Sequence, residues 1–268
     1  MFLKLGNKLC EFRRPVVMGI LNATDDSFYG ASRASTAEDL LRSLRVAIAQ
    51  GADIIDVGAC STRPGSEPVS VEKETERLGF ALNIIRNENT TVPLSVDTFR
   101  AEMVVICAQY GVDIINDISG GNEEMFTKVA QYDMGYVLTH NDVYADDAKV
   151  IDYFQRRIDK LNKAGVKDVI IDPGFGFNKD VADNYRMLGL LPLLKEMSGL
   201  PVLVGMSRKS MIYKVLGGSP DEALAGTITA QTLALDRGAD IIRVHDVKEA
   251  VDTVKIFMAM HNSKDIRK

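Results

Sequence analysis

Short apolar runs recur along the chain at regular intervals, with polar and mixed stretches between them. They are "VVMGILN" (16–22), "DIIDVGA" (53–59), "PLSVDT" (93–98), "DIINDI" (113–118), "GYVLTH" (135–140), "VIIDPG" (169–174), "PVLVGMS" (201–207) and "IIRVHD" (241–246). Each run is nearly continuously apolar, which is typical of a parallel strand that is covered on both faces. The pattern therefore predicts a series of buried strands.

The intervals between these runs carry helical periodicity. In residues 36–51 the apolar positions Leu40, Leu44, Ala47 and Ile48 fall on one stripe. Thr36 is a suitable N-cap for this helix, and Gly51 a suitable stop. Similar patterns predict helices over 70–88, 99–111, 153–165 and 219–238.

Eight strand-then-helix units predict an α/β fold, a single (β/α)8 barrel. The alternative is an open doubly wound sheet. No GxGxxG motif follows the first run, and the even spacing persists to the eighth unit, so the barrel is favoured. We expect one domain over residues 1–268, in which residues 1–14 form a small cap at the bottom of the barrel.

Composition narrows the class of protein. The 268 residues with 46% hydrophobic content are enough for one large core, and the net charge of −5 gives no positive field for nucleic acid. No apolar stretch is long enough for a membrane span, and the first ten residues lack a signal-peptide core. The three cysteines are scattered without a CxxC pair, which argues against disulfides or a zinc site. We therefore expect a cytoplasmic protein that binds neither nucleic acid nor membranes.

Polar side chains gather where the strands end. In a barrel of this type the active site lies at the carboxyl ends of the strands. Those ends carry Asn22, Asp56, Asp97, Asn116, Asp117, His140, Asp172, Ser207, Lys209, Arg243 and His245. A structural role is favoured for Asp117 and remains open for Asp56, since both stand among apolar neighbours. Lys209 follows a buried strand beside Ser207, so we expect it to bind a ligand.

Two long polar loops, after the first and second strands, are expected to lie over this mouth. The second loop contributes Arg63, which with Arg243 and His245 gives three basic groups for an anion. Asn22 and nearby carboxylates suit a divalent cation beside it. Cation, arginine and histidine together suit a diphosphate. Because the chain has no Walker-type loop, the anion is expected to belong to a small substrate.

At this point the sequence resembles the dihydropteroate synthase family. The segments that carry the resemblance are "MGILNATDDSF", "GADIIDVGACSTRPGSEPVS", "SVDTFRAE", "IINDISGG", "IIDPGFGF", "PVLVGMSRKSMI" and "GTITAQTLALDRGADIIRVHDVKE". They follow in the family's order, from about residue 15 to residue 257. "STRPG" and "SRKS" together are highly specific, whereas "DPG" or "INDI" alone would be weak.

The resemblance implies an activity and a division of the site. The family condenses 6-hydroxymethyl-7,8-dihydropterin diphosphate with 4-aminobenzoate, releases pyrophosphate, uses Mg2+, forms homodimers through late helices and is the target of sulfonamides. By motif, the pterin would be bound by Asp97, Asn116, Asp172, Lys209 and Arg243; the pyrophosphate by Asn22, Arg63, Arg243 and His245, with magnesium at Asn22; and the aminobenzoate by Thr62, Pro64, Phe177, Ser207 and Phe28.

The chemistry agrees with this division. An aminopyrimidinone presents alternating donors and acceptors, which an Asp, an Asn and a cation can match in a fixed array. The reaction breaks a C–O bond at a methylene that is conjugated to an electron-rich ring, and the amine of 4-aminobenzoate is already neutral. No strong general base is needed, so catalysis should come from positioning and from stabilisation of the leaving diphosphate. The residues expected to act in catalysis are Lys209, Arg63, Asp97, Arg243 and His245.

Several positions depart from the family pattern. Ala23 and Asp25 replace Val and Pro of the first loop, "YGAS" stands in place of Asp-Gly-Gly, and Cys60 replaces a Glu. After the fifth strand "THN" replaces "MHM", so Thr139 removes a methionine that packs on the pterin in the family. The alternatives are a pterin-binding methyltransferase-type barrel, a paralogue with altered or lost activity, and a non-catalytic pterin-binding protein. The diphosphate clamp argues against the methyltransferase.

Overall fold

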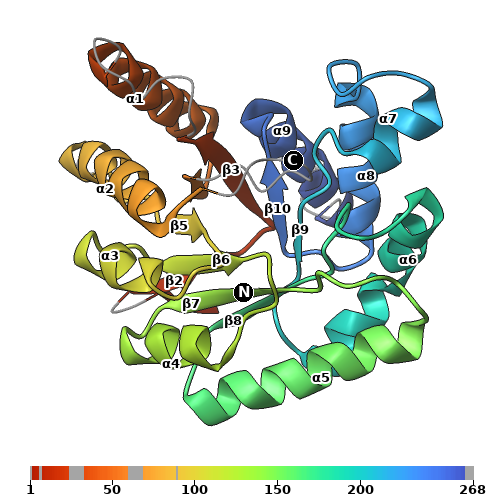
Figure 1. The fold of residues 1–268 in the computed structure, drawn as a ribbon. Helices are drawn as coiled ribbons and strands as arrows, with labels where there is room; N and C mark the ends of the chain where they lie inside the picture. The colour runs from red at the N-terminus through yellow and green to blue at the C-terminus, as the bar shows by residue number, and fades with distance from the viewer. Residues whose placement is uncertain (1, 6–7, 24–32, 60–68, 89, 263–268) are drawn as a thin grey trace.

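Eight parallel strands form the centre of the molecule, which confirms the predicted (β/α)8 barrel (Figure 1). The computed structural model describes residues 2–5, 8–23, 33–59, 69–88 and 90–262. The barrel strands are β3 (Val16–Asn22), β4 (Ile54–Gly58), β5 (Leu94–Asp97), β6 (Ile114–Asp117), β7 (Gly135–Thr139), β8 (Val169–Asp172), β9 (Leu203–Val204) and β10 (Ile241–Val244). Every run predicted as a strand contains one of them.

The strands pair in the order β8-β7-β6-β5-β4-β3-β10-β9, and every pair is parallel. An isolated parallel bridge between Ile171 and Val202 joins the two ends of this order, β8 and β9. The ring thus closes, although β9 itself is short.

Helices surround the ring on its outside (Figure 1). They are α1 (Arg33–Gln50), α2 (Val71–Asn87), α3 (Met103–Gln109), α4 (Glu123–Gln131), α5 (Asp147–Ala164), α6 (Val181–Ser198), α7 (Ser210–Leu216), α8 (Leu224–Asp236) and α9 (Val247–His261). Helix α5 begins earlier than predicted, because Asp146 caps it by accepting a hydrogen bond from the Lys149 amide at 2.8 Å. In the described part of the chain, no helix has the length and apolarity needed to cross a membrane.

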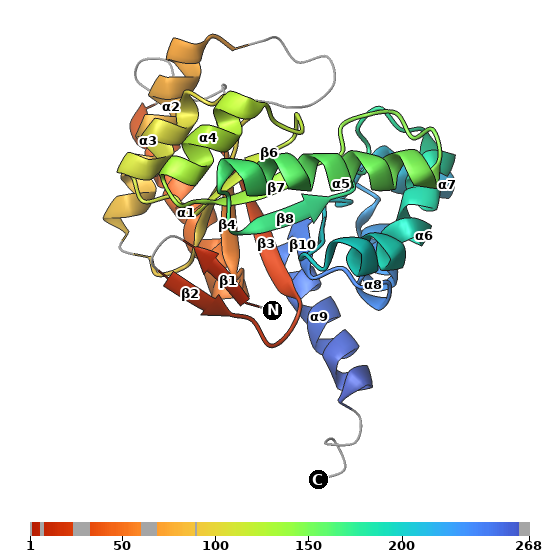
Figure 2. The same cartoon turned by 90° about the horizontal axis from the view of Figure 1, so that it is seen from below.

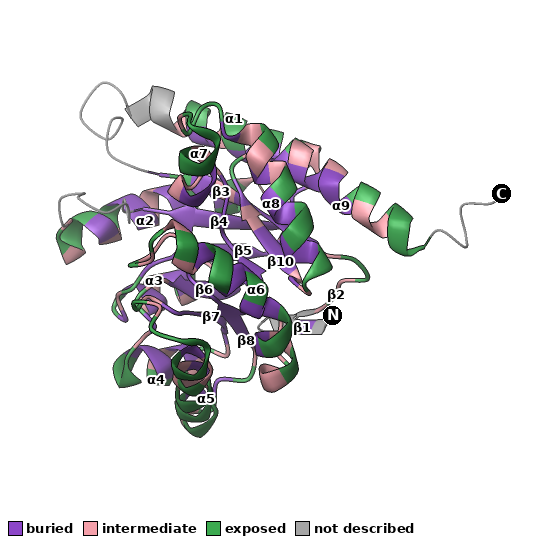
Figure 3. Ribbon diagram, turned by 90° about the vertical axis from the view of Figure 1, so that its right-hand side faces the viewer, coloured by how far each residue is buried: buried purple, intermediate pink, exposed green. Residues whose placement is uncertain are grey.

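Side chains alternate between the two faces of each strand, and this separates two apolar clusters. The inner cluster fills the amino-terminal half of the barrel with Val16, Met18, Ile54, Ile114, Val137, Ile170, Leu203 and Ile241. The alternate strand residues, such as Val17 and Ile55, belong to a larger cluster between the strands and the helices. Figure 3 shows the strands as the buried interior and the helices exposed on their outer sides.

An antiparallel hairpin, β1 (Phe2–Leu5) and β2 (Lys8–Glu11), precedes the barrel. Figure 2 shows it at one end of the barrel. Leu3 is buried in the inner apolar cluster, and Cys10 and Phe12 pack against that cluster. The hairpin therefore lies at the end of the barrel where the strands begin, and the carboxyl ends of the strands lie at the opposite end.

Candidate active site

The inner face of the barrel changes from apolar to polar toward the carboxyl ends of the strands. Continuing the inward alternation beyond the inner apolar cluster gives Asp56, Ser95, Asp97, Asn116, Thr139, Asp172 and Arg243. The strand registers place Asp97 level with Asn116 and Thr139 level with Asp172. We call these seven residues the inner polar layer. All but Arg243 are buried, and its side chain is 19% exposed.

Arg243 is the centre of this layer. Its Nε donates to Asp56 Oδ2 at 2.6 Å, and its Nη2 donates to Asp97 Oδ2 at 2.9 Å. Burial opposes the charge of the guanidinium, but the two carboxylates outweigh this effect and raise its pKa. Asn116 Nδ2 also donates to Asp56 Oδ2, at 3.1 Å. Asp56, whose role was open, thus holds two predicted ligand-binding residues in place.

The carboxyl groups of Asp97 and Asp172 are held at raised pKa values. Burial raises the pKa of Asp97 to about 7, against the opposing charge of Arg243. Burial also raises the pKa of Asp172, opposed by Lys209 and by a hydrogen bond from the Gly174 amide to Asp172 Oδ1 at 2.8 Å. Asp97 Oδ1 is buried without a hydrogen-bond partner among the described residues. A ligand donor that enters the layer would satisfy it.

Lys209 reaches this layer from the loop after β9. Its Nζ donates to the Phe175 carbonyl and lies 4.6 Å from the centroid of the Phe177 ring. Burial lowers its pKa to about 8, although the charge of Asp172 works in the other direction. Gly176 makes this approach possible, because a Cβ there would stand 3.0 Å from Lys209 Cδ. The ammonium group thus lies next to an aromatic face and interacts electrostatically with Asp172.

Arg208 fixes the loop that carries Ser207 and Lys209. Its backbone is left-handed, with φ of 54°. Its guanidinium forms a bidentate ion pair with the Asp246 carboxylate, with distances of 2.8 and 2.9 Å. Its Nη1 also donates to the carbonyls of Pro220 and Asp221. Arg208 is therefore turned away from the layer, and its neighbours on either side are presented to the mouth.

Ser207, His245 and Asn22 lie at the rim. Ser207 Oγ accepts a hydrogen bond from the His245 amide at 3.3 Å and lies 3.0 Å from His245 Nδ1. The His245 side chain is exposed, as is Asn22 at the end of β3. Asn22 is level with Gly58 in the register, and Gly58 is level with Asp97. Both exposed groups are accessible to a ligand above the layer.

Two polar strand-end residues face the opposite way. Asp117 accepts hydrogen bonds from Tyr136 Oη at 2.7 Å and from the Ser119 amide and hydroxyl at 2.7 and 2.6 Å. His140 is buried with its ring 4.7 Å from the Tyr153 ring, and burial lowers its pKa to about 4. Both belong to the packing between strands and helices. Their position one residue after Asn116 and Thr139 already indicates this, because neighbouring strand residues face opposite sides.

Lys179 is a half-buried cation that the sequence analysis did not predict as important. Its Nζ donates to the carbonyls of His140, Gly174 and Phe177 at 2.8, 3.0 and 3.1 Å, and burial lowers its pKa to about 8. It holds the loop after β8 against the end of β7. No local pattern marks it, because its partners come together only in the fold.

Four predicted site residues lie outside the described residues: Phe28, Thr62, Arg63 and Pro64. The same is true of three departures from the family pattern, which are Asp25, the segment "YGAS" (29–32) and Cys60. Their predicted roles therefore stay predictions.

The described residues contain no cluster of three or more His, Cys, Asp or Glu side chains that could hold a metal ion by itself. Mg2+ commonly takes only one or two protein oxygens and completes its shell with water and substrate phosphates. The exposed Asn22 amide at the rim offers one such oxygen. The site thus fits a magnesium ion that arrives with a diphosphate.

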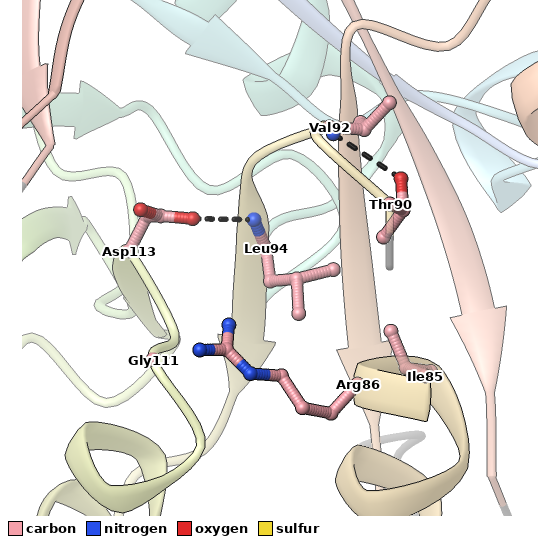
Figure 4. A pocket seen from close by; sticks show the side chains of 7 residues that line it. All are labelled: Ile85, Arg86, Thr90, Val92, Leu94, Gly111 and Asp113. Carbon is pink, nitrogen blue, oxygen red and sulfur yellow. Dashed lines mark hydrogen bonds between the residues drawn. The ribbon is translucent and has the colours of Figure 1, made fainter. Parts of the chain in front are cut away.

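A separate hollow lies at the amino ends of the strands (Figure 4). It is lined by Ile85, Arg86, Thr90, Val92, Leu94, Gly111 and Asp113. Asp113 Oδ2 is already bonded to the Leu94 amide at 2.9 Å. None of the predicted site residues lines this hollow.

Comparisons with known proteins show the family to which the chain belongs. A family described as "Pterin binding enzyme" matches residues 18–245. The dihydropteroate synthase of Escherichia coli K12 is 37% identical over 272 aligned positions, which cover 95% of each chain. The Xanthomonas albilineans dihydropteroate synthase solved with 4-aminobenzoic acid superposes with a TM-score of 0.90 at 36% identity, covering 97% of this chain and 98% of that one. The Coxiella burnetii dihydropteroate synthase in complex with pteroic acid superposes with a TM-score of 0.88 at 34% identity, and the match covers 98% of this chain and 99% of that one. This chain therefore belongs to the pterin-binding enzymes and, among them, to the dihydropteroate synthase family.

Proposed function

We propose that the barrel mouth carries out the reaction of its family with the division of labour described below. The reaction joins 6-hydroxymethyl-7,8-dihydropterin diphosphate to 4-aminobenzoate and releases 7,8-dihydropteroate and pyrophosphate. The observation that carries the proposal is the inner polar layer. It brings Asp97, Asn116, Asp172 and Arg243 together with the ammonium group of Lys209.

The pterin lies in the inner polar layer. Asp97 Oδ1, which lacks a described partner, accepts from the aminopyrimidinone N–H groups, and Asp172 accepts from the same edge. Asn116 supplies both a donor and an acceptor, and Lys209 donates to a carbonyl or ring nitrogen. Arg243 lies against the ring face. The Coxiella burnetii enzyme was solved in complex with pteroic acid, which supports a pterin as the ligand.

The diphosphate lies at the rim. Arg243 uses Nε and Nη2 on Asp56 and Asp97, so its Nη1 is the group that can reach a phosphate oxygen. Asn22 and His245 are exposed above it, and Arg63 completes the anion site. Asn22 would hold Mg2+, which when bound supplies positive charge to the leaving diphosphate.

The aminobenzoate lies between the rim and the two loops. Ser207 and Phe177 form its described side, and Thr62, Pro64 and Phe28 form the rest. The Xanthomonas albilineans enzyme was solved with 4-aminobenzoic acid, which supports 4-aminobenzoate as a ligand. Ser207 contacts His245, so the aminobenzoate and diphosphate sites share a hydrogen bond.

The residues act by position and charge. The inner polar layer holds the pterin methylene in line with the incoming amine. Aligning two reactants in this way lowers the activation free energy by several kcal/mol. As the C–O bond breaks, positive charge develops on the methylene and negative charge on the diphosphate. Arg243, His245 and Arg63 stabilise the negative charge. The amine attacks as the neutral species and then loses its proton to solvent.

Location and assembly complete the proposal. Exposed Leu233 on α8 and Ile256 and Met260 on α9 offer an apolar surface for a homodimer through the late helices. The buried Cys107 is a free thiol, which suits the reducing cytoplasm.

Pyrophosphate release tests the function. The protein is incubated with the pterin diphosphate, 4-aminobenzoate and Mg2+, and each component is omitted in turn. We expect one pyrophosphate per dihydropteroate and none without either substrate. Pterin binding without release would favour a non-catalytic pterin-binding protein, and methyl transfer from a methylated folate would favour a methyltransferase-type barrel.

A further inference from the structure

The side chain of Thr139 is an unexplained polar group in the inner polar layer. It is fully buried, and its Oγ1 has no hydrogen-bond partner among the described residues. Leaving a buried hydroxyl unpaired is costly, so native structures rarely keep one without a use. A partner for this hydroxyl must therefore come from outside the described residues.

The backbone around Thr139 is firmly held from the outer side. Its carbonyl accepts a hydrogen bond from Tyr153 Oη at 2.8 Å, and the next carbonyl, that of His140, accepts from Lys179 Nζ at 2.8 Å. The methyl group of Thr139 lies toward the turn after β8, since a Cβ on Gly174 would stand 3.2 Å from Thr139 Cγ2. The side chain is therefore fixed by its surroundings before any ligand binds.

The position of Thr139 in the inner polar layer indicates where a partner would lie. It is level with Asp172 on β8, and it follows Val137, which is level with Asn116 on β6. Thr139 thus stands between two residues to which we assign pterin contacts. A hydroxyl can both donate and accept, so it matches either an N–H group or a ring nitrogen or carbonyl.

We propose that the Thr139 hydroxyl forms a hydrogen bond with the pterin ring, at the edge between Asn116 and Asp172. This makes Thr139 a specificity residue of this chain, at a position where the family motif has a methionine. The inference rests on the proposed function, because it needs a pterin in the layer.

Three variants separate the hydroxyl from the shape of the side chain. Thr139→Val keeps the shape and removes the hydroxyl, and Thr139→Ser keeps the hydroxyl and removes the methyl group. Thr253→Val is the control, since it removes a hydroxyl that is bonded within α9, to the Glu249 carbonyl. Binding of 6-hydroxymethylpterin is measured by calorimetry after thermal unfolding shows that each variant is folded.

We expect Thr139→Val to weaken pterin binding about three- to tenfold, the range of one neutral hydrogen bond. Thr139→Ser and Thr253→Val should stay within about twofold of the wild type. Unchanged or tighter binding by Thr139→Val would overturn the inference, and so would equal weakening by Val and Ser, which would assign the effect to packing. Failure of the wild type to bind the pterin would instead overturn the proposed function itself.

Discussion

At the mouth of the barrel, burial disfavours the charged forms of several individual side chains. Asp97 and Asp172 have raised pKa values and Lys209 a lowered one, and burial is the leading cause in each case. Each group is therefore held nearer to its neutral form than it would be in water. A ligand that brings matching donors and acceptors gains from groups that the protein leaves incompletely satisfied.

The affinity for a pterin should depend on pH through Asp97. The carboxylate accepts from the ligand only when ionised, and burial raises its pKa to about 7. Affinity should therefore rise as pH increases through about 7, and should fall by up to about tenfold per unit below it. Calorimetry from pH 5.5 to 8, corrected for titration of the ligand itself, measures this.

Asp97→Asn is the control for the pH effect. It should bind more weakly and lose the rise near pH 7. A rise of the same size in Asp97→Asn would assign the titration to another group.

Lys209→Met should separate activity from stability. Since folding lowers the pKa of Lys209 from 10.5 to about 8, the wild type loses stability as pH falls through that range, and the variant has no such loss. At pH 7 the variant should unfold at the same temperature or higher, while kcat/KM falls about a hundredfold or more.

Lys209→Arg should not restore this rate, because a planar fork does not replace a compact ammonium. Wild-type turnover in a folded Lys209→Met protein would contradict the assignment of Lys209 to the site.

Most residues of the inner polar layer could be predicted from the sequence, because strand ends and motifs mark them. Asp97, Asn116, Asp172 and Arg243 all lie in the inner polar layer. The exact function of Asp56 could not be identified, because its two partners, Arg243 and Asn116, are distant in sequence. Such a contact exists only after the barrel has closed.

At the scale of elements, the turn after β8 helps to position the site residue Asp172. Gly174 has a φ of +71°, and its amide donates to Asp172. A Cβ on Gly174 would stand 2.2 Å from the His140 carbonyl oxygen, a backbone atom that Lys179 also holds. The turn therefore requires glycine both for its conformation and for its space.

Gly174→Ala should destabilise the protein by about 1–3 kcal/mol, the range for a strained left-handed residue, and should lower turnover by displacing Asp172. Gly189→Ala is the matched control, because Gly189 lies within α6 and nothing stands within 4 Å of its added Cβ. It should stabilise the protein by about 0.5–1 kcal/mol. Denaturant unfolding of both variants checks this, and equal stability of the two would contradict the account of the turn.

The elements were predictable because each strand is a continuous apolar run. The first residues of the helices were less predictable than the strands. Helix α3 begins at Met103 and α8 at Leu224, later than the predicted starts at residues 99 and 219. Side-chain bonds explain the delay before α8, where Ser219 donates from its amide and hydroxyl to Glu222 in a turn. These local bonds compete with the helix and are hard to see in the pattern.

At the scale of the whole molecule, the three parts of the site should be coupled. Asn22 and Arg63 are proposed to hold the diphosphate, and the segments that follow or flank them carry Phe28, Thr62 and Pro64. On the described side, Ser207 and His245 are joined by a hydrogen bond. Filling the diphosphate site should therefore assist formation of the aminobenzoate site.

A sulfonamide that mimics 4-aminobenzoate should bind measurably only when pyrophosphate and Mg2+ are present. The mimic must in turn tighten pyrophosphate by the same factor, since coupling between binding sites is reciprocal. Calorimetry with each ligand alone and with both measures this factor. Equal affinity of the mimic in both conditions would show that the aminobenzoate site is formed in advance.

The barrel places neighbouring strand residues on opposite faces, and Asn116 and Asp117 show this contrast most clearly. Asn116 faces inward and bonds to Asp56, whereas Asp117 faces outward and bonds to Tyr136 and Ser119. If the inner polar layer is the pterin site, only the first of these two residues should matter for the ligand.

The most direct test is the dissociation constant of 6-hydroxymethylpterin for Asn116→Ala and Asp117→Ala, measured where both variants are folded. We predict that Asn116→Ala weakens binding about tenfold or more. Asp117→Ala should bind within about twofold of the wild type while unfolding at a lower temperature, since it leaves the buried Tyr136 hydroxyl without its acceptor. Equal loss of affinity in the two folded variants would contradict the assignment of the pterin to the inner polar layer.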